Sequence, residues 1–287
     1  CLSRGLGDVY KRQHSRLLYK HFTNRPFLIL HSPFMIITVD EVNNKKRIIV
    51  LNKSDLADKN QNEKWIRYFK NKGDLAILVD SNSGKGIKEC INAIRKCYEA
   101  ETYVQKGRIG KSIRIMILGI PNVGKSSFIN RISKKASAQV GNKPGITRQK
   151  QWIKVDDNIE LMDTPGVLWP KFENEQVALN LAYTGTIKDD ILQTIEIGFQ
   201  LLKFLVKNYR KNIIERYKLD PDQIHKIMEQ DLEENKLVLA ILDEIGKKRG
   251  ALISGGYVDQ EKTAGIILDD FRNGKLGEIT LEQVHKT

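Results

Sequence analysis

The sequence has few cysteines and no long apolar run. Three cysteines in 287 residues are too few for a disulfide framework, and Cys90 and Cys97 lie about two turns apart on an expected helix, too far to form a bridge. The longest apolar stretch, residues 27–39, is too short to span a bilayer and is interrupted by His-Ser-Pro. No charged segment followed by an apolar run and a small-residue cleavage site opens the chain, so we expect no signal peptide. These features favour a protein of the reducing cytosol.

Acidic residues are outnumbered by basic ones. The chain has 48 Lys and Arg against 35 Asp and Glu, a formal net charge of +13. Residues 188–287 hold 16 basic and 18 acidic residues, so the cationic excess lies before them. Such a field favours the phosphates of RNA or DNA, or an anionic membrane surface. A solvated, lysine-rich surface is the alternative.

Short apolar strands alternate with helical patterns up to about Asn174. Strands are expected at 47–51, 75–79, 113–118, 151–155 and 159–162. Helices are expected between them, at 63–71, 87–104 and 125–135. This alternation predicts an α/β fold with a mostly parallel sheet covered on both faces.

Helical patterns alone follow Asn174. They are expected at 191–209, 222–233, 236–248 and 259–273. We therefore expect an atypical leader over 1–44, an α/β domain over 45–173 and a smaller all-α domain over 174–287.

The strongest local motif is GIPNVGKS, residues 119–126, which fits G-x-x-x-x-G-K-[ST]. It lies between the expected strand IRIMIL and an expected helix, where backbone N–H groups converge on phosphates. We expect Lys125 to contact the β- and γ-phosphates of a nucleotide and Ser126 to bind Mg²⁺. A chance match is the alternative, which the flanking strand disfavours.

Two further loops carry groups suited to a metal ion and a γ-phosphate. DTPG begins at Asp163 after an expected strand, so that its carboxylate suits the outer shell of Mg²⁺ and the N–H of Gly166 suits the γ-phosphate. DTPG alone can be a simple β-turn, but its position downstream of GKS favours the nucleotide site. Thr147, in the intervening KPGIT, is the candidate switch hydroxyl that completes the metal shell.

The sequence NKSD, residues 52–55, directly follows the strand RIIVL. Guanine presents N1–H and N2–H donors on one edge, and an ionised Asp55 can accept both. Adenine lacks this pair of donors and would leave the carboxylate unpaired, which is costly. We expect Lys53 to lie along the base plane and Asn52 to tie this loop to the phosphate loop. A helix cap at Ser54 and Asp55 is the alternative.

A second polar loop, DSNSGKG at residues 80–86, follows the strand LAILV and is typical of loops that back the base. Four motifs thus follow strands at the edge where α/β sheets bind ligands. Together they predict a P-loop GTPase fold. Because NKSD precedes GIPNVGKS, the order is circularly permuted.

The chain resembles the circularly permuted GTPases of the YlqF/YawG class and, among them, the ribosome biogenesis GTPase A group. The resemblance runs from about Lys45 onward and rests on RIIVLNKSDLAD, GIPNVGKSSFIN, KPGITRQKQWI and DTPGVLWPKFE. It also covers the tail KKRGALISGGYVDQEKTAGIILDDFRNGKLGEITLE, which is not a GTPase motif and so points to this group in particular.

The resemblance implies a bacterial or organellar GTPase that binds the precursor of the large ribosomal subunit late in its assembly. It implies that the all-α domain contacts ribosomal RNA, first at Lys247, Lys248, Arg249 and the Gly255-Gly256 turn. It also implies a monomeric cytoplasmic factor with no membrane partner, GTP or GDP and Mg²⁺ as ligands, and K⁺ through Asn122 as a further counter-charge.

The start of the chain departs from the family. Residues 1–44 do not show the family's opening strand ending in Asp-Ala-Arg-x-Pro, and we interpret them as a fragment with a foreign or frame-shifted leader. We expect that departure to fall on the edge of the sheet. The family's amino-terminal Gly-His-Met histidine is not found, and Val167 stands where a water-positioning glutamine occurs elsewhere. The alternative function is therefore a GTP-gated RNA-binding module without turnover; a P-loop small-molecule kinase is disfavoured because NKSD would have no role in it.

The expected site has three overlapping groups of residues. The catalytic group is Lys125, Thr147 and Gly166, and the metal ligands are Ser126, Thr147 and Asp163. The nucleotide-binding residues are Asn52, Lys53, Asp55, Ser81, Asn82, Pro121, Asn122, Val123, Gly124, Lys125, Ser126, Ser127, Thr147 and Gly166.

Overall fold

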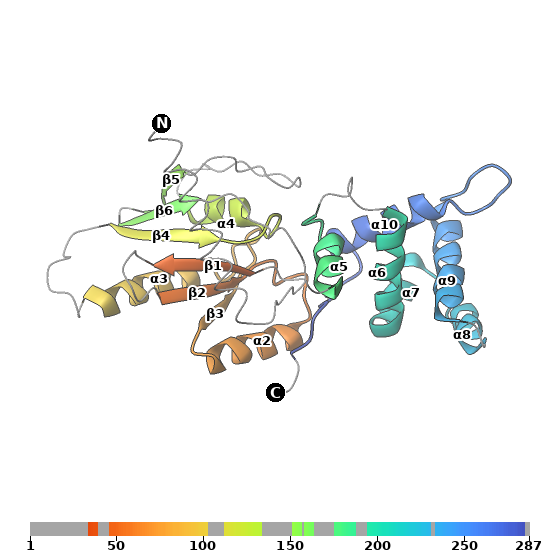
Figure 1. Ribbon diagram of the computed structural model, residues 1–287, viewed down its shortest axis with the longest axis horizontal. Coiled ribbons are helices and arrows are strands. Elements are labelled where there is room, and N and C mark those ends of the chain that lie inside the picture. The colour runs from red at the N-terminus through yellow and green to blue at the C-terminus, as the bar shows by residue number, and fades with distance from the viewer. Residues whose placement is uncertain are drawn as a thin grey trace. The chain divides into compact units, whose positions relative to one another are not determined.

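The computed structural model describes residues 34–39, 46–102, 112–133, 151–156, 158–163, 175–187, 194–230 and 233–284. Residue contacts divide the chain into two units (Figure 1). The first comprises Cys1–Val177 together with Thr280–Thr287, and the second comprises Ala178–Ile279.

The first unit contains a mixed sheet of six described strands, in the order β3-β2-β1-β4-β6-β5. The strands are β1 (Phe34–Val39), β2 (Lys46–Leu51), β3 (Leu75–Leu78), β4 (Ile113–Leu118), β5 (Gln151–Lys154) and β6 (Ile159–Asp163). β2, β3, β4 and β6 run in one direction, whereas β1 and β5 run antiparallel to their neighbours. The expectation of a mostly parallel sheet is therefore correct for four described strands, and the other two make the sheet mixed.

β1 is a strand that the motifs did not predict. It pairs antiparallel with β2 and with β4, and Ile37 lies opposite both Ile48 and Ile117. β1 therefore lies inside the sheet. We expected residues 1–44, which differ from the family's opening sequence, to fall on the edge of the sheet, and for β1 that expectation is wrong. The physical reason is the composition of FMIITV, whose apolar and β-branched residues suit a strand buried on both faces. Met35 and Ile37 on one face are 0% exposed, and Ile36 on the other face is 6% exposed.

Helices cover both faces of this sheet. Successive residues of a strand point to opposite faces, so Ile37 joins the larger core, whereas Ile36 joins the smaller one. The larger core includes residues of α3 (Ile87–Thr102) and α4 (Lys125–Ile132). The smaller core includes residues of α2 (Lys59–Asn71). Because both faces are buried, the central strands carry apolar residues on both faces, although β2 begins with Lys46 and Arg47 and β4 contains the exposed Arg114.

The second unit is helical in its described part. The helices are α5 (Glu175–Tyr183), within which the boundary between the units falls, α6 (Thr194–Asn208), α7 (Arg210–Tyr217), α8 (Pro221–Glu229), α9 (Glu234–Arg249) and α10 (Gln260–Arg272). α10 packs against α6 and α9 (Figure 1). At Gly198 of α6 a Cβ would lie 2.6 Å from the Cβ of Ala264, so glycine is what lets α6 and α10 approach this closely. Across the described part of the chain, we find no helix with the length and apolar character needed to cross a membrane.

The chain returns to the first unit after α10. The hydroxyl of Thr280 accepts a hydrogen bond from the backbone N–H of Asp58 at 3.1 Å, and the indole N–H of Trp65 donates to the carbonyl of Glu282 at 3.4 Å. Val284 packs against the smaller core. The sequence pattern placed 174–287 together, whereas the residues from Thr280 onward group with the first unit.

Candidate nucleotide-binding site

Three of the motif loops, and the first residue of the fourth, lie at one edge of the sheet. Because β2, β3, β4 and β6 share one direction, the residues that follow them lie at the same edge. NKSD follows β2, DSNSGKG follows β3, GIPNVGKS follows β4, and DTPG starts at the last residue of β6. This is the carboxyl edge, where α/β sheets bind their ligands.

The phosphate loop has the backbone that its motif requires. α4 begins at Lys125, and its N-cap is Gly124 with a φ of 87°. Asn122 also lies in the left-handed region, with a φ of 60°. The first N–H groups of a helix have no acceptor within the helix, so this end of α4 is suited to bind an anion. The buried Lys125 donates through Nζ to the carbonyls of Gly119 at 3.2 Å and Ile120 at 3.4 Å, which holds its ammonium at the loop.

Asn52 joins three of the four loops. Its Nδ2 donates to the carbonyl oxygen of Val123 in the phosphate loop at 2.9 Å. Its Oδ1 accepts from the backbone N–H of Ser81 at 3.2 Å and from the Ser81 hydroxyl at 2.7 Å. Asn52 is 1% exposed, so these bonds form away from water, where an unpaired amide would be costly. The link that the sequence predicted between NKSD and the phosphate loop is therefore present, and a second link to the DSNSGKG loop is added.

The close approach of Asn52 explains the glycine at position 124. A Cβ on Gly124 would lie 2.3 Å from Nδ2 of Asn52, and its φ of 87° would strain any other residue. The glycine therefore serves the phosphate loop in two ways. It permits the turn into α4 and leaves room for the Asn52 amide, which connects the NKSD loop to the phosphate loop.

Asp55 is the exposed group of the NKSD loop. The loop is held by hydrogen bonds from Ser54 N–H to the carbonyl of Val79 at 3.1 Å and from Val79 N–H to that of Leu51 at 2.8 Å. Burial raises the pKa of Asp55, and Asp80 raises it further, while a backbone hydrogen bond and Lys53 act in the opposite direction. Burial also lowers the pKa of Lys53, which Asp55 offsets in part. A solvent-reachable carboxylate beside a partly desolvated ammonium suits the recognition of a donor pair on a base.

The DSNSGKG loop is held by its own turn and by α4. Asp80 accepts from the N–H of Asn82 at 2.8 Å, and Arg131 of α4 donates to the carbonyl oxygen of Ser83. Burial alone would raise the pKa of Asp80, but hydrogen bonds from Ser83 and Asn82, together with the charge of Arg131, hold it below its usual range. At Gly84 a Cβ would meet the Arg131 guanidinium at 2.8 Å. The helix that starts at the phosphate loop therefore also supports the loop that backs the base.

Of the three expected metal ligands, the structure describes Ser126 and the backbone of Asp163, and their residue types are suited to Mg²⁺. Ser126 is half-buried at the start of α4. The backbone of Asp163 lies in register with Ile117 of β4, two residues before Gly119, so the end of β6 adjoins the phosphate loop. Hydroxyl and carboxylate oxygens are the donors that Mg²⁺ prefers. Thr147 and Gly166 lie outside the described residues.

Two supporting residues were missed by sequence reasoning. Arg131 supports Ser83, and Asn62 of α2 donates through Nδ2 to the carbonyl of Ser54 at 3.0 Å. Both lie on helices several residues beyond a motif. Their types and spacings carry no local signal, because their partners are set by the packing of helices on the sheet.

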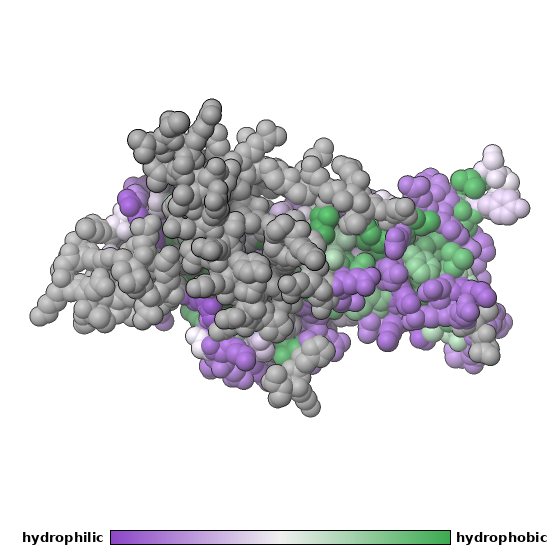
Figure 2. All heavy atoms as spheres, in the orientation of Figure 1, coloured by the Kyte–Doolittle hydropathy of each residue, from purple (hydrophilic) through white to green (hydrophobic). Residues whose placement is uncertain are grey.

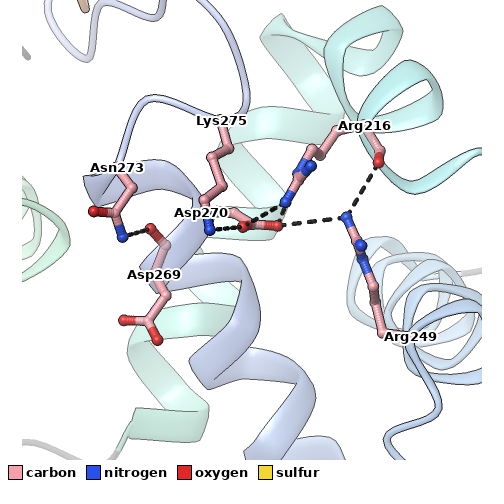
Figure 3. A network of polar contacts seen from close by, with 6 residues as sticks. All are labelled: Arg216, Arg249, Asp269, Asp270, Asn273 and Lys275. Atoms are coloured by element: carbon pink, nitrogen blue, oxygen red, sulfur yellow. Dashed lines mark hydrogen bonds and ion pairs between the residues drawn. The ribbon is translucent and has the colours of Figure 1, made fainter.

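A buried carboxylate in the second unit gathers three cations (Figure 3). Asp270 of α10 is 4% exposed and accepts two hydrogen bonds from Arg216 of α7, at 3.0 and 2.8 Å. Arg249 and Lys275 lie 3.7 and 3.5 Å from its oxygens. Burial alone would raise the pKa of Asp270, but the hydrogen bonds and charge of Arg216, with Lys275 and Arg249, hold it below its usual range. Three cations around one carboxylate leave a local excess of positive charge.

A hairpin with exposed apolar residues on its arms follows the basic carboxyl end of α9. It spans residues 252–258 after α9 and is closed by bonds from Ile253 N–H to the carbonyl of Tyr257 at 2.9 Å and from Gly256 N–H to that of Ile253 at 3.1 Å. Tyr257 is 73% and Ile253 54% exposed. Figure 1 shows the loop standing away from α9 and α10, and Figure 2 shows hydrophobic residues toward its base and near-neutral residues at its tip. Such a hairpin is suited to contact a partner surface.

The fold and the site define a P-loop GTPase whose guanine-reading loop precedes its phosphate loop. Residues 114–243 match the family described as 50S ribosome-binding GTPase, and residues 33–173 match the RsgA GTPase family. A protein of Bacillus cereus named ribosome biogenesis GTPase A is 43% identical over 247 residues, which are 85% of this chain and 79% of that protein. The chain therefore belongs to the ribosome biogenesis GTPase A family, and it is a GTP-binding ribosome assembly factor with GTPase activity.

More distant relatives agree with this assignment. A Thermotoga maritima protein of the same name is 25% identical over 239 residues, 83% of this chain and 77% of that one. The GDP-bound structure of TM YlqF superposes with a TM-score of 0.58 at 22% identity, covering 82% of each chain. At that identity the likeness shows the fold alone.

Proposed function

We propose that this chain binds the precursor of the large ribosomal subunit and uses GTP hydrolysis to license a late step of its maturation. We further propose that it acts in the cytoplasm as a monomer. The observation that carries the proposal is the Asn52 network, which joins a guanine-reading loop and a phosphate loop into one site. The description of the family matched by residues 114–243 and the name of the Bacillus cereus relative support the ribosomal partner.

Each loop has a distinct task in this proposal. Asp55 accepts the N1–H and N2–H of guanine, Lys53 lies along the base, and Ser81 and Asn82 back it. Lys125 and the N–H groups at the start of α4, with Pro121, Val123 and Ser127 shaping the loop, bind the phosphates. Ser126, Thr147 and Asp163 hold Mg²⁺, which when bound neutralises charge on the β- and γ-phosphate oxygens.

A monovalent cation beside Asn122 is part of the proposal. Asn122 lies within the phosphate loop with a φ of 60°, and K⁺ held by its side-chain oxygen would add a counter-charge to the γ-phosphate. GTP hydrolysis that is equally fast in Na⁺ and in K⁺ at equal ionic strength would remove K⁺ from the scheme.

We propose that the second unit supplies the RNA contact. Lys247, Lys248 and Arg249 end α9, where cations are favoured by the helix dipole whether or not RNA binds. The surplus positive charge around Asp270 and the exposed ring of Tyr257 are not explained by the helix dipole, and they favour an RNA contact. Cations bind phosphates, an exposed aromatic ring can stack on an unpaired base, and the Gly255-Gly256 turn permits close backbone approach.

In the proposal, the bound nucleotide controls how tightly the chain binds the subunit precursor. GTP orders the KPGIT and DTPG loops through Thr147 and Gly166, and hydrolysis releases them. The assembly factor would then hold the subunit precursor with GTP bound and leave it with GDP bound.

The deciding experiment is co-sedimentation with immature and mature large subunits in GTP, GDP and a non-hydrolysable analogue, together with multiple-turnover phosphate release. We expect binding to immature subunits to be strongest with the analogue and turnover to rise on their addition. Nucleotide-dependent binding without turnover would instead support a GTP-gated RNA-binding module. Binding that is equally strong with GTP, GDP and the analogue would contradict both functions.

A paired variant tests the RNA contact. The double variant Lys247→Glu, Lys248→Glu should weaken sedimentation with subunits about 10-fold or more, since several phosphate contacts are lost, and should leave GDP affinity unchanged. Lys226→Glu on α8, exposed like the other two, is the control for added negative charge. Equal weakening by the control would mean that general charge, and not the end of α9, carries the binding.

A further inference from the structure

The end of the described chain holds the start of α2. Asp58 is the N-cap of α2, and its carboxylate accepts from the N–H of Gln61 at 2.9 Å. The N–H of Asp58 itself lies outside the helix ladder, and it donates to the hydroxyl oxygen of Thr280, which is 222 positions away. Thr280 is 1% exposed, so this bond is shielded from water. A side chain beyond the second unit therefore fixes a helix of the first.

α2 in turn holds the base-reading loop. Asn62, in the first turns of α2, is 3% exposed and donates through Nδ2 to the carbonyl of Ser54 at 3.0 Å and that of Ala57 at 3.5 Å. Ser54 immediately precedes Asp55. A shift of the first turn of α2 therefore moves the peptide that carries the Asp55 carboxylate.

Gln61 offers a second acceptor for the same N–H. It is the third residue of α2, the position from which a Gln or Glu side chain accepts the N-cap N–H in a capping box. In this structure its Oε1 is buried and has no hydrogen-bond partner. The Asp58 N–H thus donates to Thr280 in this structure, and Gln61 lies at the position in α2 from which its side chain could accept the same N–H.

We propose that Thr280 and Asn62 are positioning residues for guanine recognition, that Gln61 is a reserve acceptor used only when Thr280 is lost, and that residues 280–284 form a strap over α2. The bond from Trp65 to Glu282 and the packing of Val284 on the smaller core hold the rest of the strap. The inference rests on the proposed role of Asp55 as guanine reader. When Thr280 releases the Asp58 N–H, Gln61 takes it and keeps α2 capped in a changed position.

The test measures guanine selectivity in single and double variants. Dissociation constants for GDP, IDP and ADP are determined by calorimetry for the full chain. IDP lacks the N2–H donor, so the ratio of IDP to GDP dissociation constants reports how well Asp55 is placed. A loss of folded protein alone would change both constants equally and leave the ratio unmoved.

The expected pattern is a synergy between Thr280 and Gln61. Gln61→Met alone should leave the ratio unchanged, and Thr280→Val should lower it about 2-fold, because Gln61 replaces the lost acceptor. The double variant should lower it about 10-fold, more than the single effects combined. Thr280→Ser keeps the hydroxyl and should restore the ratio of the unaltered chain.

Thr263→Val is the matched control. Thr263 is a fully buried threonine of α10 whose hydroxyl donates to the carbonyl of Asp259 at 2.7 Å, so this variant loses a comparable bond far from NKSD in the sequence. Its ratio should not change; an equal fall in Thr263→Val and Thr280→Val would overturn the inference. If Thr280→Val does not fold, Trp65→Phe removes the bond to Glu282 and should lower the ratio by itself.

Two failures are distinguishable. A chain that binds GDP no more tightly than ADP overturns the proposed function before any variant is compared. A chain that strongly prefers GDP, but keeps its IDP-to-GDP ratio in the Thr280→Val, Gln61→Met double variant, overturns the strap alone.

Discussion

The side-chain amide of Asn52 and the carbonyl oxygen of Val123 are 2.9 Å apart although 71 positions separate them in the sequence. In the proposed function one of these loops reads the base and the other surrounds the phosphates, so that a nucleotide would contact both. The bond fixes the spacing of the two loops before the nucleotide arrives, which lowers the conformational cost of binding.

Removing that amide should affect both stability and binding. Asn52→Ala leaves the buried carbonyl of Val123 and hydroxyl of Ser81 without this partner, so we expect a loss of about 2 kcal/mol in the free energy of unfolding and clearly weaker GDP binding. Urea denaturation and calorimetry measure the two effects. Asn208→Ala is the control, since exposed Asn208 bonds only a helix carbonyl, that of Phe204, in the bonds described here; a similar loss in both variants would contradict the role of Asn52.

Gly124→Ala should disable the phosphate loop. The methyl group would lie 2.3 Å from Nδ2 of Asn52 in addition to the strain of a positive φ. Gly73→Ala shares the positive φ, 77°, but meets no atom within 4 Å. We expect Gly73→Ala to cost about 1 kcal/mol with GDP affinity intact, and Gly124→Ala to cost more and to weaken GDP binding at least about 10-fold. Equal nucleotide affinities in the two variants would show that the close contact is unimportant.

Asp55→Asn should move base preference from guanine to xanthine. The amide supplies a donor for the C2 carbonyl that xanthine has in place of the guanine amino group, and it still accepts N1–H. Competition between GDP and XDP for the variant measures the change. An unaltered preference would show that NKSD does not read the base.

The affinity for GDP should fall in mildly acidic solution. Asp55 accepts guanine donors only when ionised, and burial raises its pKa above the ordinary value of 3.8. Affinity should therefore decline as the pH falls through this raised pKa, at values still above 3.8. A raised pKa of a folded carboxyl favours the fold as the pH falls over that range, so this group does not account for the decline by unfolding. The affinity of the Asp55→Asn variant for XDP should not decline over this pH range. If it declines as the affinity of the unaltered chain for GDP does, a group other than Asp55 causes the decline.

Asp270→Asn should destabilise the second unit at neutral pH. Arg216 and the neighbouring cations hold the pKa of Asp270 below 3.8, so this carboxylate stabilises the fold above that value and loses its contribution as the pH falls toward the depressed pKa. We expect the variant to lose about 2 kcal/mol at pH 7, with a smaller difference from the unaltered chain below about pH 4. Asp222→Asn, which alters an exposed carboxylate in α8, should change little. A constant difference at all pH values would argue against the charge of Asp270 as its source.

The sequence predicts the positions of NKSD, DSNSGKG and GIPNVGKS at the ends of strands, because the signals for these strands and turns are local. GIPNVGKS and NKSD carry their own glycines, lysine and carboxylate, and strands next to them are recognisable from a few apolar residues. β1 was missed because a family strand was sought by its motif, whereas FMIITV forms a strand through apolar burial alone. Arg131, Asn62 and Thr280 could not be assigned, since the partners of each are fixed by how distant helices and the chain end come together.

The place of β1 has a consequence for nucleotide affinity. In the described sheet it is the strand between β2 and β4, so it joins the half that carries NKSD to the half that carries GIPNVGKS. If weakened pairing let the two halves separate for part of the time, only the joined fraction could bind, and the apparent dissociation constant would rise by the inverse of that fraction. A substitution such as Ile37→Thr could therefore weaken GDP binding without altering any nucleotide motif, and saturating GDP would return the population to the joined form.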